Sequence, residues 1–328
     1  MAKSLRARPA WTSRSLKFSR IAFLFPGQGS QKAGMGRSLY DNSPAARMVW
    51  DEADSTLAAP VSSLAFEGPD DLLRQTRNAQ TALFVSEVAA FRALQDRGVR
   101  PAYCAGHSIG EYAALVAAGA LSLEQGLKLV QVRASAMERA AAERPGTMAA
   151  VIGLAAELLK SILEEASSAG AVHIANFNSP EQVVISGEAA AVELAGRLAS
   201  EAGAKRVLPL AVSGGFHSPL MQAAAAELAD VLAGAVISGP VVPVVLNVTA
   251  DFARGAEDIR ECLARQVVSQ VRWHESIIRL VESGCDAAVE VGPGRVLTGL
   301  LKRMDGAPAA SNVETADDLE SAVCDLAG

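Results

Sequence analysis

The feature of this 328-residue chain that most limits its possible folds is a set of short, mainly apolar runs bounded by glycine or proline. The runs cover residues 21–25, 101–105, 241–248 and 287–291. Runs of this length between turn residues are typical of buried strands. Helical patterns alternate with them, so we predict an α/β fold whose large domain has a mainly parallel sheet.

The middle of the chain follows another order. Strand-like and helix-like segments succeed one another as strand, helix, strand, strand, helix, strand, over residues 148–154, 157–166, 172–177, 182–186, 189–202 and 207–212. This βαββαβ order is that of a ferredoxin-like unit. We therefore predict a ferredoxin-like small domain at 145–212, inserted into a large α/β catalytic domain made of 21–144 and 213–328.

Charge is unevenly distributed along the chain. Residues 1–20 hold six basic and no acidic residues, whereas the rest holds 24 basic and 36 acidic ones. An acidic body argues against nucleic-acid binding, which depends on the neutralisation of phosphates. For residues 1–20 two interpretations stay open: a disordered basic extension, which we adopt, and an organellar transit peptide, whose composition they share.

The cysteines point to a reducing compartment. The four of them lie far apart, without a C-x-x-C pair or zinc-ligand spacing: Cys104, Cys262, Cys285 and Cys324. Apolar runs stay short of the ~18 residues that a membrane span requires. We predict a cytoplasmic protein that binds neither membrane nor metal, and expect a monomer.

The stretch Gly106-His-Ser-Ile-Gly110 lies between the predicted strand 101–105 and a helical pattern at 111–120. Gly-x-Ser-x-Gly in this context is typical of a nucleophilic serine on a tight strand-to-helix turn. Such a turn exposes the hydroxyl near free N–H groups, which stabilise an oxyanion. The alternative is a glycine-rich turn with a helix-capping serine. Ser108 is therefore a candidate nucleophile, and the motif alone does not identify the acyl acceptor.

A nucleophilic serine needs a general base. The chain has four histidines: His107, His173, His217 and His274. His217 lies in the loop 213–218, directly after the last predicted strand of the small domain, and open α/β sheets place their sites in loops after strands. We take His217 as the best candidate base, with an ordinary solvated loop histidine as the alternative.

An arginine lies on an apolar helix face. Ser122-Leu-Glu-Gln125 predicts a capped helix start, and Val130, Arg133 and Met137 follow on one side of that helix. An arginine among apolar neighbours either extends its guanidinium to water or binds an anion. The pattern leaves both outcomes open.

Taken together, six stretches carry a family resemblance: 25–31, 106–112, Arg133, 176–180, 213–218 and 290–294. With these motifs, in this order over about residues 21–305, the chain resembles the malonyl-CoA:acyl-carrier-protein transacylases and the acyltransferase domains of fatty-acid and polyketide synthases. The resemblance implies an α/β-hydrolase-like large domain.

The same resemblance assigns the reacting groups. Ser108 would be the acylated nucleophile and His217 its general base and then acid. The main-chain N–H groups of Gln28 and Ile109 would form the oxyanion hole. A main-chain carbonyl of Gln266 would orient the histidine in place of an aspartate.

Substrate binding is implied in the same way. Arg133 would hold the free carboxylate of a malonyl group, to which a planar guanidinium is suited. Gln80 and Met137 would lie in the same pocket. Phe216 before His217, together with Ile109, matches malonyl-selective members, since a small residue in place of Phe216 accompanies methylmalonyl.

The implied reaction is a ping-pong transfer from malonyl-CoA to the phosphopantetheine thiol of an acyl carrier protein, without metal or other cofactor. Two alternatives stay open: a serine thioesterase or hydrolase, and a non-catalytic protein that only docks carrier proteins. Carrier proteins of this kind are acidic, so we expect a local basic patch such as Lys205-Arg206 or Lys302-Arg303 to contact them.

Overall fold

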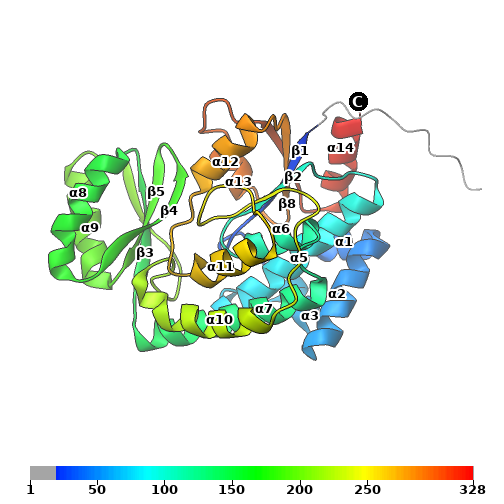
Figure 1. The fold of residues 1–328 in the computed structure, drawn as a ribbon, viewed down its shortest axis with the longest axis horizontal. Coiled ribbons are helices and arrows are strands. Elements are labelled where there is room, and N and C mark those ends of the chain that lie inside the picture. Colours follow the sequence, from blue (N-terminus) through cyan, green and yellow to red (C-terminus); the bar gives the residue numbers. More distant parts are fainter. Residues whose placement is uncertain (1–19, 328) are drawn as a thin grey trace, which may run out of the picture.

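Two β-sheets organise the protein in the computed structural model (Figure 1). The structure describes residues 20–327, so the predicted basic extension lies, except for Arg20, outside the described residues. Within that part of the chain, none of the helices is both long enough and apolar enough to cross a membrane.

The larger sheet is parallel throughout. Its strands lie in the order β7-β2-β1-β8-β9, and each neighbouring pair runs in the same direction. They are β1 (Ile21–Phe25), β2 (Tyr103–Gly106), β7 (Val244–Val245), β8 (Ala287–Val291) and β9 (Ala309–Val313). All residues of β1 and β8 are buried. This explains why β1 is a continuous apolar run in the sequence, whereas β8 also buries Glu290.

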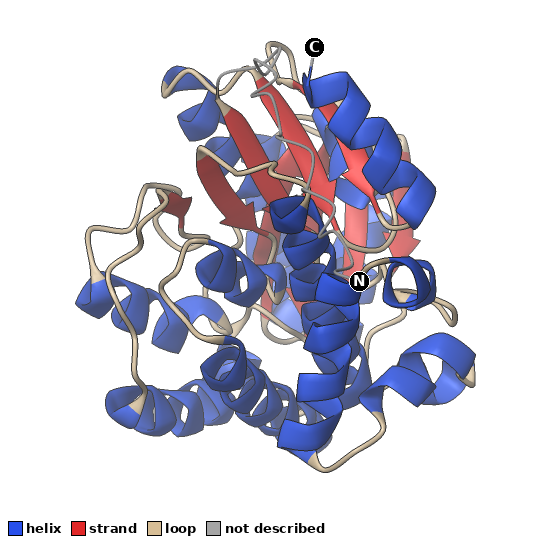
Figure 2. Cartoon of the chain, turned by 90° about the vertical axis from the view of Figure 1, so that its right-hand side faces the viewer, coloured by secondary structure: helices blue, strands red, loops and turns tan. Residues whose placement is uncertain are grey.

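Helices cover both faces of this sheet (Figure 2). They are α1 (Arg37–Asn42), α2 (Pro44–Leu57), α3 (Val61–Glu67), α4 (Asp70–Leu73), α5 (Thr76–Asp96), α6 (Gly110–Ala117), α7 (Leu123–Glu143), α10 (Gln222–Gly234), α11 (Ala256–Gln266), α12 (Trp273–Glu282), α13 (Val296–Leu301) and α14 (Ala316–Ala327), with a short 3₁₀ helix η2 (Pro219–Met221). Phe23 and Phe25 of β1 join a core with α5 and α6, whereas Ala22 and Leu24 pack with α12 and α13.

The smaller sheet is antiparallel and lies to the left in Figure 1. Its strands β3 (Thr147–Ile152), β4 (Val172–Ser179), β5 (Gln182–Gly187) and β6 (Arg206–Pro209) are ordered β4-β5-β3-β6. The helices α8 (Ala156–Ala166), with the 3₁₀ turn η1 (Ser167–Ala169), and α9 (Ala189–Glu201) cover one face and close a separate apolar core. The predicted fold class, a mainly parallel sheet with a βαββαβ unit, is confirmed; the boundaries at 145 and 212 stay a prediction.

Two predicted strands are shorter in the structure. The run 241–248 contributes only Val244–Val245, because Pro243 has no N–H to donate and the side chain of Asn247 bonds to Gly106 at the end of β2 and to Ser108 after it. The run 207–212 shifts to Arg206–Pro209. β9 and α14 lie beyond residue 305, where no strand or helix is predicted from the sequence, although Leu319, Ala322 and Leu326 of α14 follow a helical spacing.

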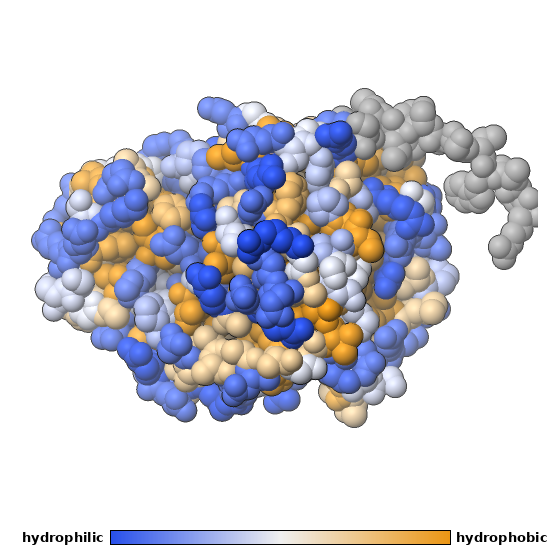
Figure 3. Space-filling model, viewed as in Figure 1, coloured by the Kyte–Doolittle hydropathy of each residue, from blue (hydrophilic) through white to orange (hydrophobic). Residues whose placement is uncertain are grey.

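Large apolar side chains on the surface are scattered. The face in Figure 3 shows hydrophilic residues interspersed with small apolar groups. The exposed ones belong to many elements: Met48, Leu72, Leu158, Leu208, Val231, Val236, Val241, Ile278 and Val296. Scattered exposure of this kind is normal for a protein surface, and the expected monomeric state stays a prediction.

Candidate active site

Ser108 occupies the tight turn between β2 and α6. Its φ angle of 54° lies in the left-handed region, which is strained for a residue other than glycine. Both flanking glycines are required by close packing. A Cβ on Gly106 would lie 2.1 Å from the carbonyl carbon of Gly110, and a Cβ on Gly110 would lie 2.3 Å from the carbonyl oxygen of Phe25. The Gly-x-Ser-x-Gly motif therefore has a steric cause in this fold.

A buried asparagine holds the turn in place. The N–H of Ser108 donates to Oδ1 of Asn247 at 2.7 Å, and Nδ2 of Asn247 donates to the carbonyl of Gly106 at 2.6 Å. Asn247 is 1% exposed. The sequence does not predict this contact, although a polar residue inside an apolar run is a signal of such a position.

His217 contacts the serine as a general base would. Its Nε2 lies 2.7 Å from Oγ of Ser108, and its Nδ1 lies 3.0 and 3.1 Å from the carbonyls of Gln266 and Ser269. Since a carbonyl only accepts, Nδ1 carries the proton and Nε2 is free to accept the serine proton. Burial, followed by the charge of Arg133, lowers the pKa of His217 to about 3. The imidazole is therefore neutral at neutral pH.

Arg133 does not extend to water. It is 1% exposed, and its guanidinium donates to Oε1 of Gln80 at 2.6 Å, to Oγ of Ser108 at 3.0 Å and to Oε1 of Gln266 at 3.0 Å. No carboxylate of residues 20–327 lies within 4.0 Å of it as an ion-pair partner. Burying a charge without a close counter-ion is costly. The guanidinium is thus available for an anionic group brought beside Ser108.

Two main-chain N–H groups of residues at this cavity are unpaired within the described part of the chain. Those of Gln28 and Ile109 have no hydrogen-bond partner among the described residues, and both residues line the cavity at Ser108. Ile109 directly precedes the first residue of α6, where helix N–H groups are unpaired. Unpaired donors at this place are suited to an oxyanion.

A cavity of about 80 Å³ joins these groups. It is lined by residues from both sheets and their loops: Gln28, Gln80, His107, Ser108, Ile109, Arg133, Met137, Met148, Asn176, Val184, Leu210, Val212, Phe216 and His217. A space this small beside Ser108 favours a short acyl group over a long chain.

The site residues predicted from sequence meet here. Gln28, Gln80, Ser108, Ile109, Arg133, Met137, Phe216 and His217 line the cavity, and Gln266 lies behind it, against His217 and Arg133. Of the other histidines, His107 lines the cavity with its Nε2 2.9 Å from Oδ1 of Asn178. His173 is exposed, and His274 of α12 is not among the residues that line the cavity.

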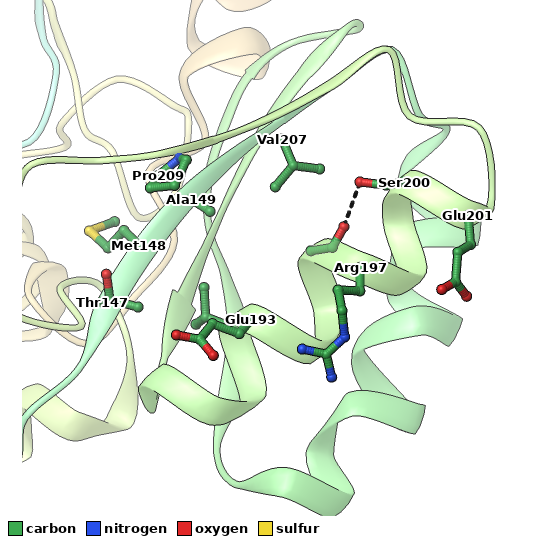
Figure 4. Close-up of a pocket in the computed structure, with 11 residues that line it drawn as sticks. Thr147, Met148, Ala149, Glu193, Arg197, Ser200, Glu201, Val207 and Pro209 are labelled. Carbon is green, nitrogen blue, oxygen red and sulfur yellow. Dashed lines mark hydrogen bonds between the residues drawn. The ribbon is translucent and has the colours of Figure 1, made fainter.

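A larger cavity of about 570 Å³ lies on the small sheet (Figure 4). α9 contributes Glu193, Arg197 and Ser200 to its wall, and Ala149 and Val207 come from β3 and β6. The hydroxyl of Ser200 donates to the carbonyl of Gly196 and has no histidine beside it. Volume alone would favour this cavity, but only the smaller of the two holds a paired serine and histidine, which makes the smaller one the candidate active site.

Comparison with known proteins agrees with this chemistry. The Acyl transferase domain family matches residues 22–319. The malonyl CoA-acyl carrier protein transacylase of Bacillus subtilis strain 168 is 46% identical over 306 residues, which are 93% of this chain and 96% of that protein.

Solved structures agree as well. The malonyl CoA-acyl carrier protein transacylase from Coxiella burnetii has a TM-score of 0.92 at 40% identity, over 96% of this chain and 100% of that one. A malonyl-transacylase solved in complex with a type II polyketide acyl-carrier protein has a TM-score of 0.90 at 42% identity, over 93% of this chain and 99% of that one.

Proposed function

This chain belongs to the acyl transferase family and is an acyltransferase; on that premise we propose that it moves the malonyl group of malonyl-CoA to the phosphopantetheine thiol of an acyl carrier protein. The observation that carries the proposal is the Ser108–His217 contact at 2.7 Å beside the buried guanidinium of Arg133. The first two groups supply acyl transfer, and the third selects an acyl group that ends in a carboxylate.

The first half-reaction forms an ester on Ser108. Oγ attacks the thioester carbonyl of malonyl-CoA while Nε2 of His217 takes the hydroxyl proton. The N–H groups of Gln28 and Ile109 stabilise the tetrahedral oxyanion, and such donors are each worth about 10²–10³ in rate. The carbon–sulfur bond then breaks, and the imidazolium gives its proton to the departing CoA thiolate.

Arg133 holds the far end of the acyl group. In the free protein the guanidinium is directed at the nucleophile, with its N–H 3.0 Å from Oγ of Ser108. A malonyl carboxylate would replace the serine hydroxyl as the acceptor and supply the missing counter-ion. Gln80, which accepts from Arg133 at 2.6 Å, fixes the plane of the fork. Phe216 would leave little room for a branched acyl group.

The second half-reaction reverses the roles. The phosphopantetheine thiol gives its proton to His217 and attacks the malonyl-serine ester, and the imidazolium returns the proton to Oγ as the ester bond breaks. The proposal requires no metal and no organic cofactor, because CoA and phosphopantetheine are substrates. It is for a monomer in the cytoplasm, a location supported by four cysteines that are all free.

Where the carrier protein docks is part of the same proposal. Lys205-Arg206 lies at the start of β6, and Lys302-Arg303 follows α13. Because Lys205 already pairs with Glu181 at 3.3 Å, its neighbour Arg206 is the freer cation of the first pair. Charge reversal at whichever of the two pairs contacts the carrier protein should slow transfer at low salt. If reversal at Lys205-Arg206 and reversal at Lys302-Arg303 both leave the transfer kinetics unchanged, neither pair is the docking surface.

Hydrolysis is the second candidate and has weaker support. A hydrolase for simple acyl groups has no need of a buried guanidinium 3.0 Å from its nucleophile. The relatives and solved structures named above are transacylases.

Intact-protein mass spectrometry tests the proposal. Mixing with malonyl-CoA should add one malonyl group, and carrier protein with a free phosphopantetheine thiol should remove it and become malonylated. Ser108→Ala should show no adduct. Loss of the adduct to water at the same rate without carrier protein would instead establish a hydrolase, and no adduct on the unaltered protein would exclude both.

A further inference from the structure

A buried carboxylate lies directly behind the catalytic turn. Glu111 comes from the first turn of α6, three residues after the nucleophile, and is 0% exposed. Its Oε2 accepts from the main-chain N–H of Asn247 at 3.1 Å and from Nε2 of Gln266 at 2.8 Å. The helix that follows the nucleophile is thus tied to the loop after β7 and to the end of α11.

Gln266 connects this carboxylate to each reacting group. Its Nε2 also donates to the main-chain carbonyl of Ser108 at 3.0 Å, and its Oε1 accepts from Arg133 at 3.0 Å. Its main-chain carbonyl accepts from Nδ1 of His217 at 3.0 Å. One residue therefore contacts the nucleophile, the cation and the base through three different groups.

The orientation of the Gln266 amide depends on its neighbours. A side-chain amide can turn over with almost no change in shape, so its hydrogen bonds decide which end faces which partner. Oε2 of Glu111 acts as an acceptor here, since the main-chain N–H of Asn247 also donates to it, and a guanidinium only donates. With Glu111 on one side and Arg133 on the other, only one orientation satisfies both. Reversal would set oxygen against oxygen and N–H against N–H.

We propose that Glu111 is a positioning residue for the acyl-transfer site: its carboxylate fixes the Gln266 amide, which in turn places the Arg133 guanidinium and the carbonyl that orients His217. The inference rests on the transfer reaction proposed above. Glu111 thus supplies a carboxylate to a site whose histidine has none in direct contact among the described residues, and Gln266 lies between that carboxylate and the imidazole.

Substitutions at Glu111 separate this role from general support of the fold. Glu111→Leu removes the acceptor, and a misplacement of about 1 Å at reacting groups costs up to roughly 10²-fold in rate. We expect kcat/KM for malonyl-CoA to fall by about 10–100-fold. The loss for acetyl-CoA should be several-fold smaller, because acetyl has no carboxylate for Arg133 to bind. A variant that is merely less folded would lose both activities by one factor.

Glu111→Gln is the conservative test. The N–H of Asn247 still requires an acceptor, so the new amide keeps its oxygen toward Asn247 and Gln266. Its hydrogen bonds lack the charge, which makes each roughly half as strong. We expect transfer within about five-fold of the unaltered protein. Loss as large as that of Glu111→Leu would overturn the proposal, and so would an unchanged malonyl-to-acetyl ratio in folded Glu111→Leu.

Glu87→Leu is the matched control. Glu87 of α5 is also a glutamate with 0% exposure, and neither of its oxygens has a hydrogen-bond partner among the described residues. Its substitution should leave the malonyl-to-acetyl ratio unchanged. If Glu111→Leu does not fold, Gln266→Met removes the same amide and keeps the carbonyl for His217. The same shift in ratio is then expected, and an unchanged ratio would overturn the proposal. Failure of the unaltered protein to transfer malonyl would instead count against the proposed function.

Discussion

Replacing Arg133 with methionine tests how the site chooses its acyl group. The unbranched side chain fills much of the same volume but removes the charge and all three hydrogen bonds, to Gln80, Ser108 and Gln266. A malonyl carboxylate would then enter a buried cavity without a counter-ion. An acetyl group, which has no carboxylate, would lose only the indirect effect on Ser108.

The structure sets the size of the two effects. Breaking a buried ion pair by removal of one partner costs about 3–5 kcal/mol, which is roughly 10²–10³-fold or more in kcat/KM for malonyl-CoA, at about 1.4 kcal/mol for each factor of ten. Acetyl-CoA leaves the bond from Arg133 to Oγ of Ser108 in place, so for this substrate the loss of that bond costs about 1.5 kcal/mol, or roughly ten-fold. The ratio of malonyl to acetyl activity should therefore fall by about 10–100-fold.

Transfer of each acyl group to carrier protein gives this ratio directly. Rates should be measured with malonyl-CoA and acetyl-CoA on one preparation, with urea unfolding to establish that the variant is folded. Arg133→Lys is the matched control: it keeps a charge without the planar fork, so the ratio should recover in part. Equal losses for both substrates in Arg133→Met would refute the assignment of Arg133 to the malonyl carboxylate.

Three further predictions follow from the geometry. Gly110→Ala should lower the free energy of unfolding by about 3 kcal/mol or more, because its Cβ would meet the Phe25 carbonyl. Gly299→Ala, with no atom within 4 Å of its Cβ, should be neutral or stabilising. Urea unfolding of the two variants measures the difference, and similar midpoints would contradict this prediction. Phe216→Ser should raise methylmalonyl-CoA activity relative to malonyl-CoA by roughly 10–200-fold in parallel kinetic assays, and an unchanged ratio would count against the selectivity assigned to Phe216. The pKa of His217 is about 3 in the native protein and about 6.5 in the unfolded chain, so the unfolded state binds the extra proton and stability falls as pH drops below about 6.5. His217→Gln should therefore lose less free energy of unfolding between pH 7 and pH 5, and equal losses in urea titrations would show that His217 is not held neutral.

Local signals predicted the fold well because they coincide with its packing. The apolar run 21–25 corresponds to β1 residue for residue, since both faces of that strand are covered. The capped helix start at Ser122 is present, with its Oγ accepting from the N–H of Gln125 at 3.1 Å. The pattern fails where a contact distant in sequence decides the backbone, as at residues 246–248, where the side chain of Asn247 bonds to Gly106 and Ser108.

In the site, too, local patterns predict a residue, whereas contacts between distant residues are not predicted. Ser108 was found from its own five residues, because the strain and close packing of the turn require glycines beside it. His217 is 109 residues away, and its loop position only made it the best of four histidines until the family resemblance supplied the pairing. The hydrogen bond from Gln266 to Glu111 spans 155 residues, and nothing in either segment indicates it.

Burial explains why such distant partners matter. In a low-dielectric interior the guanidinium of Arg133 interacts strongly with each dipole around it, so Gln80 and Gln266 must present oxygen and not nitrogen. A glutamine does not fix its own orientation, whereas a carboxylate behind it does. The choice of acyl group thus depends on Glu111, which has no place in the cavity lining. A substitution there should alter substrate preference without a change in any residue that contacts the substrate.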